Sequence, residues 1–173
     1  FDGYKFTNYG VAQGLPDRQV NDFLETRGGV YWVATAGGLC RFDPNASTQS
    51  GHGDAGRFEP RFVVYHLGDE EGSDPRVPRY QRSQAVYKLC EDSDGILWCG
   101  AESSLYRVGQ DNGRWIFTRV DLGPPTTLGS TNAVSILADR RGAVWVLAGS
   151  GLYRRRSDGI VERYTSLEGL SLT

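Results

Sequence analysis

The residues best suited to binding chemistry lie in one irregular stretch, residues 69–82, where an acidic half is followed by a basic half. The basic half contains Arg79, Tyr80 and Arg82, an aromatic ring flanked by guanidinium groups. A ring can stack on a sugar, and guanidinium groups can hydrogen-bond a carboxylate, so this stretch could bind a sugar or a carboxylate ligand. The alternative is a solvated loop whose charges pair with one another, because surface charges often do nothing specific.

The sequence shows no pattern typical of catalysis or of metal binding. Its two histidines, His52 and His66, lie in or near irregular segments and have no Ser–His–Asp or metal-ligand spacing. Residues 51–56 match G-x-G-x-x-G, but a nucleotide site needs a strand before that motif and a helix after it, so the pattern indicates a flexible loop. We therefore expect no catalytic residue, no metal site and no cofactor.

The composition is that of one ordinary globular domain. The chain has 173 residues, of which 39% are apolar, and its 19 basic side chains nearly balance 21 acidic ones. This balance argues against nucleic-acid binding, and no run approaches the roughly 18 apolar residues that span a bilayer. Because the sequence contains no methionine, even at position 1, we expect it to be part of a longer protein.

Three cysteines are too few for a disulfide framework. Cys90 and Cys99 flank an expected hairpin turn, and pairing Glu91 with Ile96 would place the two sulfurs on opposite faces of the sheet. We therefore expect both thiols, and that of Cys40, to be buried small apolar groups.

The chain contains an internal repeat that aligns on three tryptophans. In every copy a glycine lies three residues before the tryptophan, and a leucine lies seven residues after it. Each unit has four short β-rich runs separated by turns, which is typical of a β-propeller blade. We predict an all-β fold of three four-stranded antiparallel blades plus an extra strand, within a larger propeller. The tryptophans are Trp32, Trp98 and Trp145, the blade-like units are about 20–66, 85–120 and 133–165, and residues 1–9 are the last strand of a preceding blade.

The repeat also predicts where a binding surface would lie. In a propeller, the loops that lead into the first strands share one face around the central channel, and variable loops on rigid blades commonly bind ligands. The residues two positions before the first strands, Arg18, Gln84 and Asn132, are all polar and should crowd this channel mouth. We further expect the glycine before each tryptophan to relieve a turn, and the tryptophan to fill the space between neighbouring blades.

Residues 14–20, Gly-Leu-Pro-Asp-Arg-Gln-Val, followed by Gly-Leu-Cys-Arg-Phe at 38–42, resemble the two-component regulator propeller repeat. Residues 163–170 begin the same repeat motif again. One departure is Thr26, which replaces the acid that the other two units supply three residues before the turn glycine.

The resemblance implies the extracytoplasmic, periplasmic sensor region of a bacterial hybrid two-component regulator. Such propellers are usually seven-bladed, their ligands are often glycan fragments, and any kinase activity would lie in other parts of the protein. Two alternatives remain open: a structural or assembly segment without its own ligand and, more distantly, a lyase similar to streptogramin lyases. Since three blades cannot close a ring, the expected partners are an oligosaccharide or other small molecule, and the remaining blades or a second copy in a homodimer.

Overall fold

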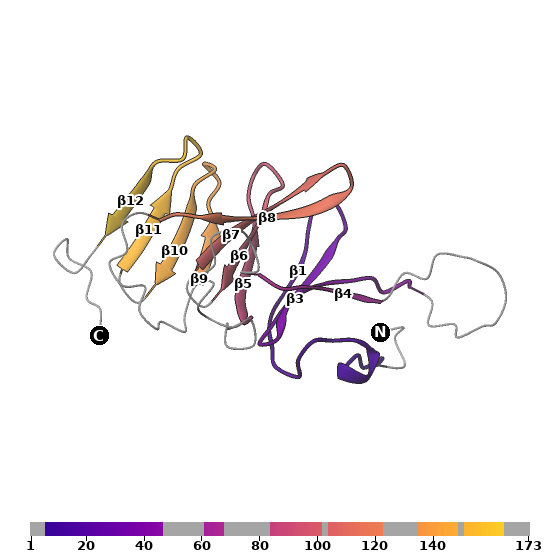
Figure 1. The fold of residues 1–173 in the computed structure, drawn as a ribbon. Coiled ribbons are helices and arrows are strands. Elements are labelled where there is room, and N and C mark those ends of the chain that lie inside the picture. The colour runs from indigo at the N-terminus through magenta and orange to yellow at the C-terminus, as the bar shows by residue number, and fades with distance from the viewer. Residues whose placement is uncertain are drawn as a thin grey trace, which may run out of the picture.

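The computed structural model describes residues 6–46, 61–67, 84–101, 104–122, 135–148 and 151–164. In this part the chain forms three four-stranded antiparallel sheets, each built from strands consecutive in the sequence (Figure 1). One short 3-10 helix, Val11–Gln13, precedes them, and the described residues include no α-helix. The predicted all-β fold of four-stranded blades is confirmed.

The three sheets, here called blades 1, 2 and 3, share one plan in which each strand pairs with the next. Blade 1 consists of β1 Val20–Glu25, β2 Tyr31–Thr35, β3 Gly38–Phe42 and β4 Phe62–Tyr65. Blade 2 consists of β5 Val86–Glu91, β6 Leu97–Ala101, β7 Ser104–Asp111 and β8 Arg114–Val120. Blade 3 consists of β9 Ser135–Ala138, β10 Val144–Ala148, β11 Gly151–Arg155 and β12 Val161–Tyr164.

The turn between the first two strands of each blade depends on its glycine. Gly29, Gly95 and Gly142 have φ values of 74°, 80° and 79°, a left-handed conformation that other residues rarely adopt. The predicted role of these glycines is confirmed.

The expected pairing of β5 with β6 is wrong by one residue. Glu91 lies opposite Leu97 rather than Ile96, because a hydrogen bond from the Asp92 N–H to the Ile96 carbonyl closes the turn and Gly95 adds one residue to it. Cys90 consequently lies opposite Trp98, and Cys99 lies opposite Leu89. The two sulfurs still belong to opposite faces of the sheet.

All three cysteines are free thiols, but only two of them are buried as expected. Cys40 and Cys99 are fully buried, whereas Cys90 is half-buried at the joint with blade 3. Burial raises the pKa of the Cys40 and Cys90 thiols to about 12, so both stay protonated and unreactive at neutral pH.

The tryptophans of β2 and β6 fill the spaces between blades, as predicted. Trp32 is fully buried, and its ring lies edge-on to Trp115 of blade 2 with ring centroids 4.9 Å apart. Trp98 is packed among apolar side chains of blade 3, and the Arg155 guanidinium lies 5.2 Å from its ring centroid. Each tryptophan therefore joins its own blade to the next one.

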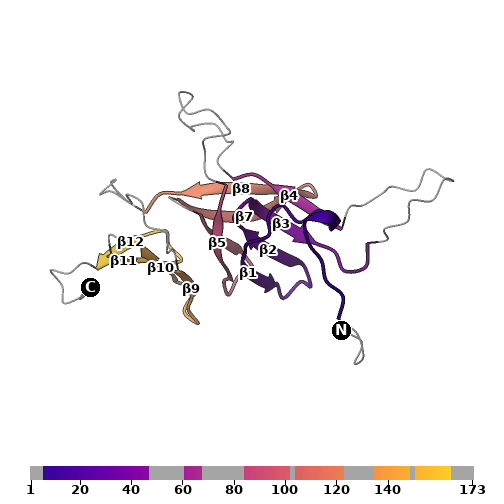
Figure 2. The ribbon, with the colours of Figure 1, turned by 90° about the horizontal axis from the view of Figure 1, so that it is seen from below.

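The first strands of the blades adjoin one another. β1 contacts β5, and β5 contacts β9. The Asn21 amide donates a 2.8 Å hydrogen bond to the Val86 carbonyl, and the Leu89 N–H donates one of 3.0 Å to the Asp22 carboxylate. In Figure 2 the strands of blade 3 lie to the left of blades 1 and 2, which overlap in this view.

A carboxylate holds the tryptophan in two of the three blades. Asp92 accepts hydrogen bonds from the Ile96 N–H of its own turn and from the Trp98 indole N–H, the latter 2.7 Å long. Asp139 bonds the Trp145 indole in the same way, at 3.0 Å, and this bond, together with backbone N–H donors, holds the pKa of Asp139 below its ordinary value.

Blade 1 lacks this bond because Thr26 occupies the place of the aspartate. The Thr26 hydroxyl accepts a 3.1 Å hydrogen bond from the Val30 N–H, but it is too short to reach the indole. The buried Trp32 Nε1 has no hydrogen-bond partner, and an unpaired buried donor is destabilising.

We expect the substitution Thr26→Asp to raise the free energy of unfolding by about 1 kcal/mol, because a carboxylate at this position can accept the Trp32 N–H. Chemical denaturation measures the change, and Thr26→Ser, which keeps a short hydroxyl, serves as the matched control. A Thr26→Asp protein no more stable than Thr26→Ser would contradict the explanation.

Candidate functional site

A chain of polar side chains crosses the start of blade 1 and reaches blade 2. The Asp17 carboxylate accepts a 2.8 Å hydrogen bond from the Gln19 N–H, and the Gln19 amide donates one of 3.0 Å to Asn21. Asn21 in turn donates to the Val86 carbonyl at the start of β5. This network holds the segment before β1 against the first strand of the next blade.

We call the polar side chains at these strand starts the polar rim. It consists of Arg18, Gln19, Asn21 and Gln84.

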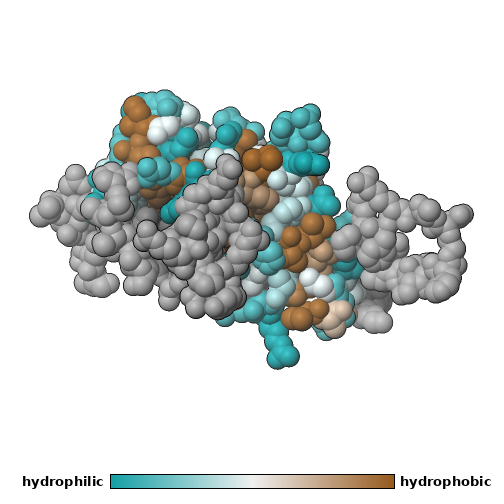
Figure 3. All heavy atoms as spheres, in the orientation of Figure 1, coloured by the Kyte–Doolittle hydropathy of each residue, from teal (hydrophilic) through white to brown (hydrophobic). Residues whose placement is uncertain are grey.

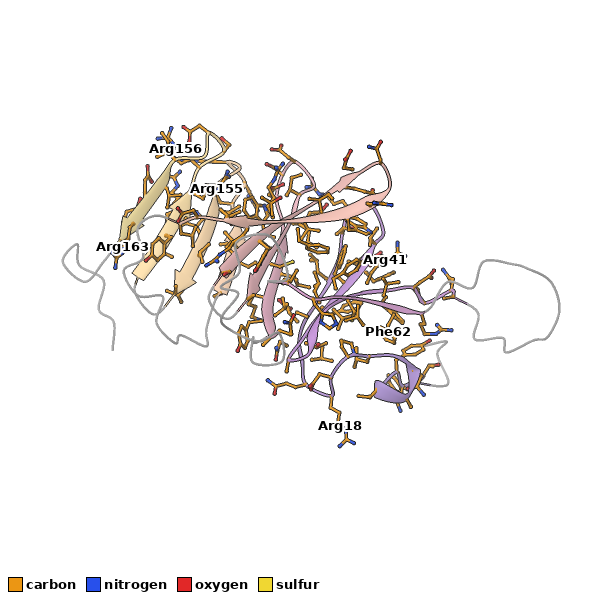
Figure 4. The ribbon with its side chains drawn as sticks, in the orientation of Figure 1. Arg18, Arg41, Phe62, Arg155, Arg156 and Arg163 are labelled. Atoms are coloured by element: carbon orange, nitrogen blue, oxygen red, sulfur yellow. The ribbon has the colours of Figure 1, made fainter. Side chains whose placement is uncertain are left out.

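Two of the six residues predicted to bind a ligand lie in this rim. Arg18 is exposed, and Figure 4 shows its side chain pointing away from the blades. Gln84 is half-buried, and its Oε1 atom is buried with no hydrogen-bond partner. Both residues precede adjoining strands by two positions, but the structure records no contact between them. The other four, Arg79, Tyr80, Arg82 and Asn132, lie outside the described residues.

The rim carries amide and guanidinium groups, whose chemistry suits hydroxyl and carboxylate groups. Leaving an amide oxygen buried and unpaired costs about 1–3 kcal/mol, and the Gln84 Oε1 atom could accept from a ligand hydroxyl only after its side chain turns outward. Arg18 supplies guanidinium donors, which suit a carboxylate.

A tight turn beside the rim was not anticipated from the sequence. Thr35 is fully buried, and its hydroxyl donates a 2.8 Å hydrogen bond to the Gly38 carbonyl and accepts one from the Gly37 N–H. A Cβ atom on Gly37 would lie 2.9 Å from the Pro16 carbonyl oxygen. Only glycine therefore lets the segment that carries Asp17 and Arg18 pack so closely on this turn.

Elements of a catalytic or metal centre do not gather at the rim. Within the described ranges, no cluster of three or more His, Cys, Asp or Glu side chains could hold a metal ion. His66 is exposed directly after β4, and His52 lies outside those ranges. The side chains with shifted pKa values lie within the blades, where burial or local hydrogen bonds account for them.

A family model for the two-component regulator propeller matches residues 80–103. The chain carries a two-component regulator propeller repeat. The match covers the approach to blade 2, including Gln84, together with β5 and β6. The match does not include blade 1, although the sequence of blade 1 contains the fuller form of the repeat motif. The search of curated proteins found no match.

Solved structures show the same fold over almost the whole chain. The extracellular domain of a B. thetaiotaomicron protein described as a hybrid two-component system is 16% identical, with a TM-score of 0.64 over 95% of this chain. A second such domain from the same organism is 15% identical, with a TM-score of 0.60 over 96% of this chain. The chain spans only 19% and 18% of these two domains, respectively.

An enzyme shares the same architecture. A catalytically inactive virginiamycin B lyase from Staphylococcus aureus, solved with quinupristin, is 16% identical, with a TM-score of 0.58 over 88% of this chain and 43% of the lyase. At such identities these likenesses show the β-propeller fold alone.

No helix in the described part of the chain is long and apolar enough to cross a membrane.

Proposed function

We propose that this chain is a ligand-sensing segment of an extracytoplasmic propeller in a two-component signal-transduction regulator. The observation that carries the proposal is the repeat at residues 80–103, because it includes Tyr80, Arg82 and Gln84 on the approach to blade 2. The likeness to extracellular domains of proteins described as two-component systems supports the same role and location. Signal output would lie elsewhere in the whole protein.

The chemistry of the approach to β5 favours an acidic oligosaccharide as the ligand. Gln84 has an unpaired amide oxygen that suits a sugar hydroxyl, and because this atom is buried, the side chain must turn outward to bind it. Arg18 lies at the start of the adjoining strand, and its guanidinium suits a uronic-acid carboxylate. Arg79 and Tyr80 add a second guanidinium and a ring that can stack on a sugar. A neutral sugar would use only part of this set.

Calorimetric titration of the 173-residue chain with trigalacturonic acid and with maltotriose tests this function. We expect the acidic trisaccharide to bind at least about tenfold more tightly, because charge-assisted hydrogen bonds are roughly twice as strong as neutral ones. Replacing Gln84 or Arg18 with alanine should weaken the binding at least about fivefold, through loss of one hydrogen-bonding group.

Matched controls are Gln110→Ala and Arg114→Ala, which remove the same side chains from exposed positions on the β7–β8 hairpin. If the rim variants and the control variants weaken sugar binding equally, the binding site does not lie at the polar rim. Absence of binding by either sugar to a folded chain would instead favour an assembly segment without its own ligand.

A further inference from the structure

β8 is the longest outer strand of the three blades, and one of its two edges is free. It spans seven residues, whereas β4 and β12, the outer strands of blades 1 and 3, span four each. It lies last in its sheet, and its pairing with β7 has no register shift. In Figure 2, β8 lies at the upper edge of blade 2, outside β7. Among the described strands, none pairs with the backbone N–H and C=O groups on its outer side.

The side chains of β8 give this edge a positive charge. The strand contains Arg114 and Arg119 and no acidic residue. Figure 3 shows mostly hydrophilic atoms at the tip of the β7–β8 hairpin, at the upper right, with an apolar area beside them. Two copies of β8 laid side by side would bring like charges together, whereas an acidic strand would bring opposite charges together. The edge therefore disfavours a second copy of this chain and favours an acidic strand.

A row of four residues in register crosses the side of blade 2 that faces blade 3. It consists of Cys90, Trp98, Arg107 and Thr118. Trp98 packs on blade 3, which fixes the direction of the row, and both Arg107 and Thr118 at its outer end are exposed. Ile116 lies on the same side of β8, two residues before Thr118, and is 47% exposed. This side of blade 2 is therefore accessible next to the free edge.

Blade 3 adds a second guanidinium to the outer part of this row. Arg155 of β11 has its guanidinium 5.2 Å from the Trp98 ring centroid. Arg107 of β7 lies directly opposite Trp98 in the strand register, so their Cβ atoms are neighbours on one side of the sheet. Two arginines from different blades thus flank the same indole.

Aromatic rings occupy the equivalent place in the joint between blades 1 and 2. The ring centroids of Tyr65 and Phe117 are 5.0 Å apart there, and Phe117 also lies 6.5 Å from Trp32. The register places Val120 and Val161 at the positions of Tyr65 and Phe117 in the joint between blades 2 and 3. The outer part of the second joint therefore carries guanidinium groups where the first carries rings.

Neither guanidinium is neutralised by an acid within the described ranges. Arg107 forms no ion pair there, and Arg155 donates only one hydrogen bond, of 3.5 Å, to a backbone carbonyl. The equivalent of Arg107 in blade 3 is Arg154, whose Nη1 lies 3.2 Å from the carboxylate of Glu162 on the adjacent strand. Blade 2 has Thr118 at the position of Glu162. A ligand carboxylate beside Thr118 would thus do for Arg107 what Glu162 does for Arg154.

We propose that β8 binds an extended acidic peptide segment of a partner protein as an additional outer strand of blade 2, with carboxylates of that segment paired to Arg107 and Arg155. Alternate side chains of an added strand point to the same side of the sheet, so an acid at every second position faces the two arginines. Charge-assisted hydrogen bonds to the guanidinium groups add to the backbone pairing. The site does not depend on the proposed sugar binding at the polar rim.

Fluorescence anisotropy with a labelled peptide as long as β8, in which glutamate alternates with threonine, tests the proposal. We expect a dissociation constant below about 1 mM, and at least about tenfold weaker binding when glutamine replaces glutamate in the peptide. Methylation of the peptide's backbone nitrogens should also weaken binding at least about tenfold, because it removes the N–H donors that pair with a strand edge.

Two variants locate the carboxylates of the peptide. Arg107→Ala and Arg155→Ala should each weaken binding of the glutamate peptide at least about fivefold, through loss of a charge-assisted partner. The matched control is Arg119→Ala, the same change at an exposed position on the opposite side of β8, which should alter binding by less than about twofold. Gln84→Ala should leave peptide binding unchanged. Circular dichroism shows whether the sheets of each variant are intact.

A folded chain that does not bind the glutamate peptide at about 1 mM would overturn the proposal. Equal binding of the backbone-methylated peptide, or displacement of the peptide by equimolar inorganic phosphate or trigalacturonic acid, would also overturn it, because the site would then accept small anions rather than an added strand. Equal weakening by Arg119→Ala and Arg107→Ala would do the same. None of these results bears on sugar binding at the polar rim, which is measured separately.

Discussion

Replacing Trp32 with alanine should lower the free energy of unfolding by about 4 kcal/mol, the usual cost of removing a large buried ring. Trp32 is fully buried between blades 1 and 2 and packs edge-on against Trp115. Its loss would leave a cavity at the joint rather than within one sheet. Equilibrium denaturation, followed by circular dichroism, measures the change.

The matched control is Trp145→Ala, which removes the same side chain from the face of blade 3 that is turned away from blade 2. Trp145 is half-buried, and among the described residues Tyr164 and Arg154 stack against it, so we expect a loss of about 1–2 kcal/mol. Equal losses for the two variants would contradict the view that the neighbouring blade buries Trp32.

Replacing Asp92 with alanine should cost about 3 kcal/mol, because one carboxylate satisfies several donors at once. Asp92 is 8% exposed, and it accepts hydrogen bonds from the backbone N–H groups of Asp94 and Ile96 and from the Trp98 indole. The substitution would leave the buried indole N–H unpaired and loosen the turn. Chemical denaturation at pH 7 measures the loss.

Two further variants separate the contributions of this carboxylate. Asp92→Asn keeps an acceptor oxygen for the turn, so it should cost less than Asp92→Ala. Asp139→Ala removes the same bonds in blade 3, where Trp145 can reach water, and should also cost less. A loss for Asp139→Ala as large as that for Asp92→Ala would show that burial of the indole is not the cause.

The lowered pKa of Asp139 adds a dependence on pH with a definite sign. A carboxyl group whose pKa is lower in the folded state stabilises the fold above its ordinary pKa, and that stability is lost as the pH falls through the folded value. Comparing the acid unfolding of Asp139→Ala with that of the unaltered chain would isolate this contribution.

The spacing around the tryptophans was enough to predict the blades, because a strand–turn–strand unit is a local structure. Glycine three residues before Trp98 marks the turn, and alternating apolar residues mark the strands on either side. The register of β5 against β6 could not be predicted in the same way. It depends on the conformation of Gly95 and on the hydrogen bond between Asp92 and Ile96, which the order of residue types does not specify.

Less of the candidate site could be predicted, because its residues lie where the repeat is interrupted. Arg18 and Gln84 were found by counting back from the first strands, and the structure places both at strand starts. Asn21 was missed because it lies at a shift in the pairing of β1 with β2, and its counterparts Tyr87 and Ser135 are of other residue types. A polar residue at the second position of a first strand was the available signal.

The measurement that tests this account most directly is a nuclear Overhauser effect between the ring protons of Trp32 and Trp115. The two residues are far apart in the sequence and belong to different blades, and their ring centroids lie 4.9 Å apart. The stacked-blade structure predicts a strong cross-peak between them in the folded chain. Its absence, in a chain whose sheets are intact by circular dichroism, would contradict the face-to-face packing of blades on which the rest of the account depends.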